Sequence, residues 1–174
     1  IFGFATTGVG IVVAALALLL TLVIGAGWFS PDWALTSFTN KLRGIAPEGS
    51  PPPVAVIWVL MVAASVFAAY TVNGLVALGE ETGWRGWLQS ALEPLGRGQG
   101  IVLTGVIWGL WHAPLIVMGY EYGGRLPAAA GIALFTCLCA GLGTLLSWLR
   151  VRSGSVLPAA ITHGAFNAFA SLPA

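Results

Sequence analysis

Six side chains suited to acid–base chemistry or charge stabilisation lie in three short polar islands between long apolar runs. The islands are residues 79–86 (GEETGWRG), 108–112 (WGLWH) and 163–167 (HGAFN). Their polar members are Glu80, Glu81, Arg85, His112, His163 and Asn167. Ionisable groups at membrane depth are costly, and those that persist there usually serve a function. The islands therefore predict a polar reaction centre held among apolar helices.

The first island combines two carboxylates with one guanidinium. Glu81 and Arg85 are four residues apart, so on a helix they share a face and can form an ion pair. Glu80 is rotated from Glu81 by about 100° and can point elsewhere. A neighbouring arginine favours the charged form of a poorly solvated carboxylate, which is the form that a general base requires. The alternative is a helix end whose charges are solvated at the membrane interface.

The other two islands contain both histidines of the chain. His112 can act as a proton shuttle or a metal ligand; alternatively, it is a core histidine bonded to a backbone carbonyl that Pro114 leaves free. His163 and Asn167 share a helical face, where both can donate hydrogen bonds to an oxyanion. Their alternative role is a polar clamp between helices.

Together the islands contain a carboxylate base, a histidine partner and oxyanion donors, which are the parts of a hydrolytic centre. Neither a Gly-x-Ser-x-Gly elbow nor a His-Glu-x-x-His motif is present in the sequence. Cys137 and Cys139 lie away from the islands and on different faces of a helix, which argues against a thiol nucleophile and against their pairing. We interpret Trp108 and Trp111 as packing residues or interface anchors.

The composition indicates an integral membrane protein with an all-α fold. Of the 174 residues, 57% are hydrophobic and 7% are charged, whereas a soluble domain has about 25% charged residues. The mean hydropathy is +0.91. The length suits a single domain over residues 1–174. The net charge of +1 and the scattered basic residues exclude a nucleic-acid partner.

The elements that position the islands are predicted to be five transmembrane helices. They lie within residues 1–31 (8–28 alone can span), 54–78, 101–119, 128–149 and 156–170. The loop at 29–53 ends in three prolines and can contain a short interfacial helix near 33–42. A straight helix over 54–92 would be about 58 Å long, against a membrane core of about 30 Å.

That second helix must therefore tilt, run along the interface, or break near Gly79, Gly83 or Gly86. Pro114 predicts a kink or an early end of the third span. The chain begins with Ile1 rather than Met, so we expect a truncated or processed form with upstream helices missing. If all five helices cross, the basic residues fall into two groups on opposite sides, and the larger group favours the cytoplasm. That group consists of Arg85, Arg97, Arg150 and Arg152.

The three motifs resemble those of the CAAX protease and bacteriocin-processing family (CPBP, or Abi), which includes the type II CAAX prenyl proteases. The shared pattern is Glu-Glu-x-x-x-Arg, aromatic-x-x-x-His and His-x-x-x-Asn, in this order, within residues 54–170. The chain differs in having Trp108 where the family usually has Phe. Family members also usually have more helices, which agrees with a truncated N-terminus.

This resemblance implies an intramembrane endopeptidase whose cavity between helices hydrolyses a peptide bond of a membrane-associated, prenylated or leader peptide. It assigns the general base to Glu80 acting with His112, and the oxyanion donors to His163 and Asn167. Supporting roles fall to Glu81 and Arg85. The implied partners are a peptide or lipidated-protein substrate and the lipid bilayer, which is the plasma membrane if the protein is prokaryotic.

Two mechanisms are compatible with the sequence. Glu80, His112 and His163 could bind Zn²⁺ with an open fourth position, with Glu81 then as a candidate base. We favour a metal-free mechanism and assign no cofactor. The reason is that Asn167 beside His163 suits an oxyanion role better than metal ligation. Two other functions could use the same residues. In an inactive membrane scaffold or immunity protein, the motifs would serve as interhelical clamps. In a proton-coupled transporter, their ionisable residues would serve as proton relays.

Overall fold

The computed structural model describes residues 35–45, 50–122 and 126–170, and every regular element within these ranges is a helix. The predicted all-helical membrane fold is confirmed. The described residues belong to two compact units. The first contains Val76–Ala160, and the second contains parts of Thr7–Leu75 and Ile161–Ala174. The first predicted span, at residues 8–28, lies outside the described residues.

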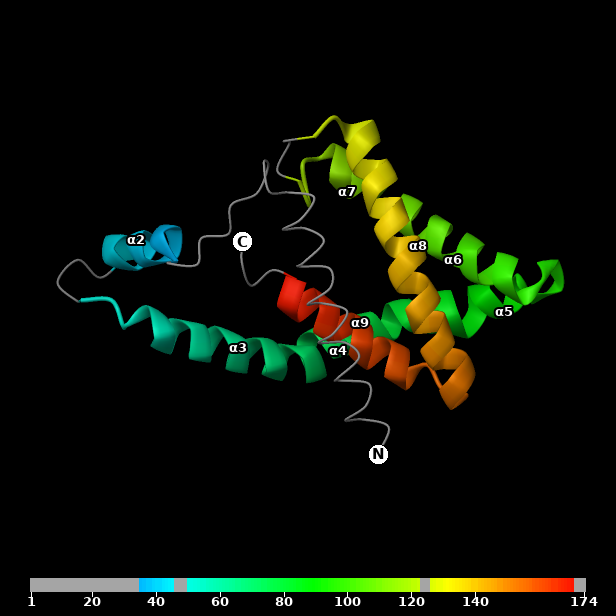
Figure 1. Ribbon diagram of the computed structural model, residues 1–174, viewed down its shortest axis with the longest axis horizontal. Helices are drawn as coiled ribbons and strands as arrows, with labels where there is room; N and C mark the ends of the chain where they lie inside the picture. The colour runs from blue at the N-terminus through cyan, green and yellow to red at the C-terminus, as the bar shows by residue number, and fades with distance from the viewer. Residues whose placement is uncertain (1–34, 46–49, 123–125, 171–174) are drawn as a thin grey trace. The chain divides into compact units, whose positions relative to one another are not determined.

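Seven α-helices of five residues or more and three shorter or non-α segments follow one another along the described chain (Figure 1). They are α2 (Thr36–Ile45), α3 (Val54–Tyr70), α4 (Val72–Glu81), the π-helix η1 (Thr82–Leu88), α5 (Gln89–Ala91), the 3₁₀ helix η2 (Glu93–Leu95), α6 (Arg97–Trp111), α7 (Ala113–Val117), α8 (Ala128–Ser153) and α9 (Leu157–Ala170).

Three helical stretches within the described residues are long and apolar enough to cross a membrane. They are Val54–Ala91, Arg97–Val117 and Ala128–Ser153. These stretches correspond to the second, third and fourth predicted spans. The fifth predicted span is the helix α9, whose 14 residues make a length of about 21 Å, which is shorter than a membrane core of about 30 Å.

The second span differs from its prediction in length and in the position of its break. It continues for 38 residues, and its regular geometry is interrupted at Thr71, which has φ −115° and ψ −101°. Of the three outcomes predicted for this long helix, a break near Gly79, Gly83 or Gly86 does not occur. Gly79 lies within α4, and the other two glycines lie in η1. The wider hydrogen-bonding pattern of a π-helix changes the geometry without ending the helix.

The polar segment before this span is only partly described. Its helix, α2, covers Thr36–Ile45, so the predicted range of 33–42 was placed too early. Trp33, the predicted start, lies outside the described residues. The three prolines precede α3 as expected, and Pro53 occupies its N-cap position with φ −53° and ψ 140°. This extended geometry, which proline favours, starts the helix at the next residue.

In the first unit, α6 and α8 approach each other closely through two glycines. A Cβ atom built on Gly105 would lie 2.7 Å from the Cα of Ala140, and one on Gly109 would lie 2.5 Å from the Cα of Thr136. The spacing Gly-x-x-x-Gly is typical of close contacts between membrane helices, and it was not recognised in the sequence. Just after the second glycine, the ring of His112 lies next to Phe135 of α8.

The break at Pro114 is confirmed. The helix α6 ends at Trp111, His112 lies in the following turn, and α7 begins with Pro114 in its first turn. Proline has no N–H and cannot continue the hydrogen bonding of α6. The consequence is that His112 lies at the junction of two helices rather than inside a continuous one.

In the second unit, small residues bring α9 against the junction of α3 and α4. A Cβ on Gly164 would lie 2.8 Å from the Cα of Gly74. Ala69, Ala165 and Ala168 are buried together beside this contact. Small side chains of this kind allow helix backbones to pack closely without a hydrophobic driving force. The contact determines where the third polar island is held within its unit.

Replacing Gly105 by Ala tests whether the close approach of α6 and α8 stabilises the protein. The added methyl group would overlap the backbone of Ala140, and overpacking destabilises proteins by about 1–3 kcal/mol. We therefore expect a lower midpoint of thermal unfolding for the detergent-purified variant. Gly141→Ala is the matched control, because nothing lies within 4 Å of its added Cβ. Equal midpoints for the two variants would contradict the role given to this contact.

Candidate active site

The centre of the first unit contains a buried ion pair. Glu81 Oε1 lies 2.8 Å from Arg85 Nη1, and neither side chain is exposed. The predicted pairing is confirmed, and the alternative of solvated charges at a helix end is wrong for these two residues. Breaking such a pair by removing one partner typically destabilises a protein by about 3–5 kcal/mol. The pair is therefore a structural requirement for this part of the chain.

Two other helices enclose the guanidinium of Arg85. Its Cζ lies 4.6 Å from the ring centroid of Trp108 on α6, in a cation–π arrangement. On α8, a Cβ added to Gly143 would lie 2.8 Å from Arg85 Nη2, so the absence of a side chain at this position leaves room for the guanidinium. The buried charge is thus accommodated by one aromatic face and one glycine.

Glu80 points to a different set of partners from Glu81, as their rotation around the helix predicted. Its Oε2 accepts hydrogen bonds from Trp108 Nε1 at 3.0 Å and from Trp84 Nε1 at 3.4 Å. The first bond connects α4 to α6. Because both indoles donate to the same oxygen, the carboxylate is oriented while its Oε1 is engaged by neither of them.

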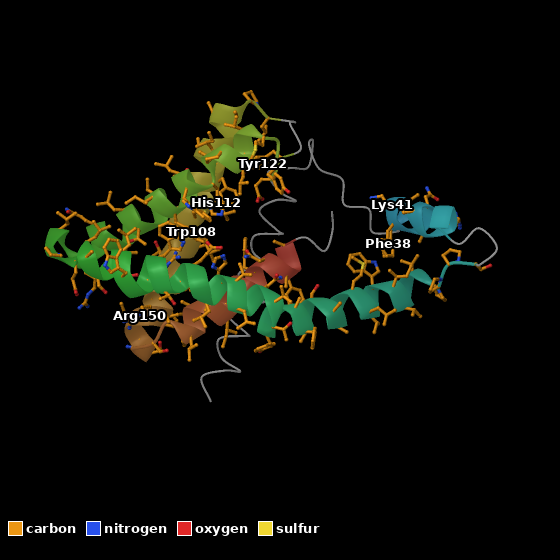
Figure 2. All side chains as sticks on the ribbon, turned by 180° about the vertical axis from the view of Figure 1, so that it is seen from behind. Phe38, Lys41, Trp108, His112, Tyr122 and Arg150 are labelled. Atoms are coloured by element: carbon orange, nitrogen blue, oxygen red, sulfur yellow. The ribbon has the colours of Figure 1, made fainter. Side chains whose placement is uncertain are left out.

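His112 is oriented by the same tryptophan. Its Nδ1 lies 2.9 Å from the carbonyl oxygen of Trp108, and a carbonyl can only accept, so Nδ1 carries the proton of the neutral ring. The other ring nitrogen, Nε2, is then the basic one. The ring lies edge-on to Trp111 at 5.0 Å and next to Phe135 at 4.7 Å. Figure 2 shows Trp108 and His112 close together.

This hydrogen bond can be compared with the alternative role predicted for His112, that of a core histidine bonded to a carbonyl that Pro114 leaves free. A bond to a backbone carbonyl is present, but the carbonyl belongs to Trp108, one turn earlier, and the missing N–H of Pro114 does not create it. A bond at one ring nitrogen does not exclude chemistry at the other. Catalytic and metal-binding histidines are commonly fixed in this way.

Trp108 is the candidate site residue that sequence reasoning missed. It was interpreted as a packing residue or interface anchor, yet it is buried, donates to Glu80, accepts from His112 and underlies Arg85. The available signal was the spacing of four residues before His112, which places both on one helical face. The replacement of the usual Phe by Trp was a second signal, because only the indole has an N–H to donate.

The third island lies in the second unit. His163 and Asn167 are both on α9, as predicted; His163 is 3% exposed and Asn167 is exposed. Gly164, between them, makes the contact with Gly74 described above. Their role as oxyanion donors for a reaction at Glu80 and His112 stays a prediction.

The zinc alternative also stays a prediction. Residues 35–45, 50–122 and 126–170 contain no group of three His, Cys, Asp or Glu side chains that could hold a metal ion. Of the predicted ligands, Glu80 and His112 belong to the first unit and His163 to the second. The two cysteines are free, with Cys137 exposed and Cys139 buried, which agrees with their expected positions on different helix faces.

Comparison with known proteins gives one family and one named relative. The family model described as type II CAAX prenyl endopeptidase Rce1-like matches residues 52–169, a range that includes all three islands. A protein named CAAX prenyl protease 2, from Methanococcus maripaludis, is 29% identical over 98 residues. The alignment covers 53% of this chain and 36% of that protein, so the chain matches about a third of its relative's length. No solved structure matches the chain.

Replacing Trp108 by Phe removes the indole N–H and keeps an aromatic ring. A hydrogen bond to a charged group contributes about 1.5–3 kcal/mol, so we expect the free energy of unfolding to fall by an amount in this range. Trp111→Phe, an identical change at an exposed position, is the control. Denaturant unfolding in detergent micelles gives both values, and equal losses for the two variants would refute the bridging role of Trp108.

Proposed function

The chain belongs to the type II CAAX prenyl endopeptidase Rce1-like family, and we propose that it is an intramembrane endopeptidase acting on prenylated or otherwise membrane-associated peptides. The observation that carries this proposal is the placement of Glu80 and His112 on two sides of Trp108, each oriented by a hydrogen bond to that residue. The name of the relative, CAAX prenyl protease 2, supports a peptide substrate with a lipidated C-terminal region.

In the proposed reaction, Glu80 is the general base. Its carboxylate takes a proton from a water molecule, whose oxygen bonds to the carbonyl carbon of the scissile peptide. His112 assists through Nε2, the ring nitrogen that the Trp108 carbonyl leaves basic. The proton is then given to the leaving amine as the carbon–nitrogen bond breaks. General acid–base catalysis of this kind contributes about 10²–10⁴-fold in rate.

The tetrahedral intermediate carries a negative oxygen that needs hydrogen-bond donors. We assign this role to His163 and Asn167, which can both donate. The pair of Glu81 and Arg85 supports Glu80 by holding the end of α4 in place next to α6. Integral placement in a membrane agrees with the three candidate spans, and the plasma membrane is the proposed location if the protein is prokaryotic.

A second candidate function is a membrane scaffold or immunity protein without catalysis. The observation that favours it is the bond between Glu80 and Trp108, which joins α4 to α6 and would serve as an interhelical clamp in any membrane protein. The two functions differ in what happens when Glu80 loses its charge. A clamp would lose stability, whereas a general base would lose turnover.

Replacing Glu80 by Gln separates these functions. In detergent-purified protein, we expect kcat/KM for a farnesylated peptide with a C-terminal CAAX sequence to fall by about 10²–10⁴-fold. The unfolding midpoint should fall less than that of Trp108→Phe, because the amide oxygen of the new Gln can still accept from both indoles. Glu121→Gln, at an exposed position outside the islands, should retain activity. Unchanged turnover in the folded Glu80 variant would refute its assignment as the base, and a wild-type protein without peptidase activity would favour the scaffold.

Replacing Glu81 by Gln should mainly lower the stability of the protein, in contrast to the loss of turnover expected for Glu80→Gln. The change leaves the buried charge of Arg85 without its partner, so we expect destabilisation by about 3–5 kcal/mol. The midpoint of thermal unfolding should therefore fall well below that of the Glu80→Gln protein. If the two variants exchanged these profiles, Glu81 rather than Glu80 would be the candidate base.

Removal of metal tests the proposed mechanism directly. A metal-free glutamate reaction should retain its turnover after treatment with 1,10-phenanthroline and removal of the chelator. Heat-inactivated enzyme and a known zinc peptidase are the controls. Loss of activity that added Zn²⁺ restores would support the ligand set of Glu80, His112 and His163 and would contradict the metal-free mechanism.

A further inference from the structure

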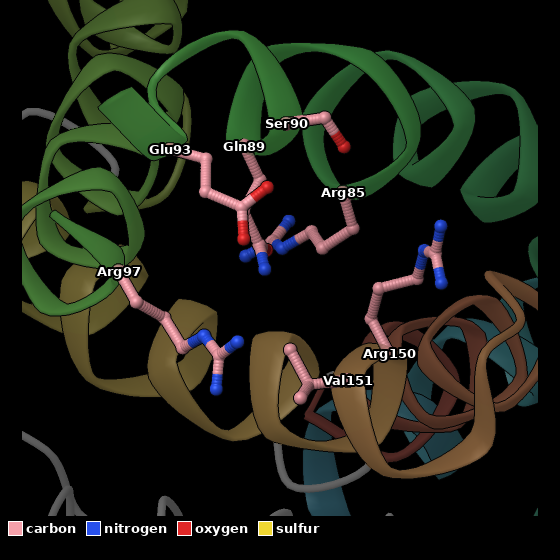
Figure 3. A pocket seen from close by; sticks show the side chains of 7 residues that line it. All are labelled: Arg85, Gln89, Ser90, Glu93, Arg97, Arg150 and Val151. Atoms are coloured by element: carbon pink, nitrogen blue, oxygen red, sulfur yellow. The ribbon is translucent and has the colours of Figure 1, made fainter. Parts of the chain in front are cut away.

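A pocket of about 200 Å³ in the first unit is lined by basic and polar side chains (Figure 3). Its lining residues are Arg85, Gln89, Ser90, Glu93, Arg97, Arg150 and Val151. They come from the helical run that contains η1 and α5, from η2 and the start of α6, and from the last turns of α8. Nothing in the proposed peptidase mechanism uses the pocket as such.

The pocket lies where three candidate spans begin or end. Arg97 is the first residue of its span, Arg150 lies three residues before the end of another, and Ser90 is next to the last residue of the third. The ends of membrane spans lie at the level of the lipid headgroups. Three of the four arginines that the sequence analysis placed on one side of the membrane line this pocket.

The basic groups of the pocket have donors that the protein does not use. Arg85 is 1% exposed, and its Nε and Nη2 are buried without a hydrogen-bond partner, as is Nε of Arg150. Leaving a buried donor unsatisfied costs about 1–3 kcal/mol, and more for a charged group. The positive charge of these two lining side chains is therefore poorly compensated by the protein, which favours an anion in the pocket.

The carboxylates near the pocket do not satisfy these donors. Glu81 engages Arg85 through Nη1, and Glu93 is exposed and forms no ion pair with a lining arginine in the described part of the chain. The lining itself contains three guanidinium groups and one carboxylate, so its charge is positive.

We propose that this pocket binds the phosphate group of an anionic phospholipid headgroup. Guanidinium groups match phosphate oxygens in geometry and charge, and basic pockets between membrane helices bind anionic headgroups. The position at the span ends favours a lipid over free phosphate, because the lipid presents its phosphate at that depth. Phosphatidylglycerol has a phosphodiester with one net negative charge and is the probe of choice.

The test compares two double variants with the same loss of charge. Arg97→Gln with Arg150→Gln removes two lining arginines, and Arg43→Gln with Arg152→Gln removes two exposed arginines outside the pocket. Each full-chain protein is titrated in uncharged detergent with dioctanoyl-phosphatidylglycerol, dioctanoyl-phosphatidylcholine or inorganic phosphate. The readouts are the shift in unfolding midpoint and the retention of lipid in native mass spectrometry.

We expect phosphatidylglycerol to bind the wild type and the control variant alike, and the pocket variant at least about tenfold more weakly, as loss of a charge-assisted hydrogen bond predicts. The proposal would be overturned if both variants bound phosphatidylglycerol equally well, or if the wild type bound phosphatidylcholine as tightly as phosphatidylglycerol. A response to inorganic phosphate equal to that of the lipid would support the phosphate site and overturn its assignment to lipid. If the double variant does not fold, Arg150→Gln alone is compared with Arg152→Gln by the same criteria.

Discussion

The burial of the ion pair between Glu81 and Arg85 constrains the rest of the described first unit. Two charges removed from water are tolerated only when their geometry is good and their surroundings exclude competing solvent. The pair therefore needs helices on more than one side. Trp108 supplies an aromatic face from α6, and Gly143 makes room on α8. The close approach of α6 to α8 through Gly105 also helps to enclose the ion pair, because it brings both of these surfaces to the guanidinium.

Trp108 connects this structural charge pair with the groups proposed to react. Its ring, its N–H and its carbonyl oxygen serve three different residues, Arg85, Glu80 and His112. A single residue thus orients both groups, the proposed general base through its side chain and the proposed shuttle through its backbone carbonyl. Preorganised groups of this kind need little rearrangement during reaction. The arrangement also separates the roles of the two glutamates, since one is paired with arginine and the other with indole donors.

The features that follow from local spacing could be predicted from the sequence. The pairing of Glu81 with Arg85 and the helix break at Pro114 depend on residues within one or two turns of each other, and the apolar runs identify the three candidate spans. The interruption at Thr71 and the π-helical turn are departures from regular geometry that the glycine positions do not indicate. The bond from Trp108 to Glu80 joins residues 28 apart, and spacing within one helix carries no information about it.

Arg85 belongs to both the candidate active site and the basic pocket, and this shared position affects how any experiment on it can be interpreted. Its Nη1 pairs with Glu81, while Nε and Nη2 have no hydrogen-bond partner. An anion bound in the pocket would therefore act on the charge of the same guanidinium that holds the end of α4 in place. A substitution of Arg85 would remove the ion pair, the cation–π contact and the anion ligand together. The separate effects can be resolved only at residues that take part in one of them, which are Glu81 for the ion pair and Arg97 or Arg150 for the pocket.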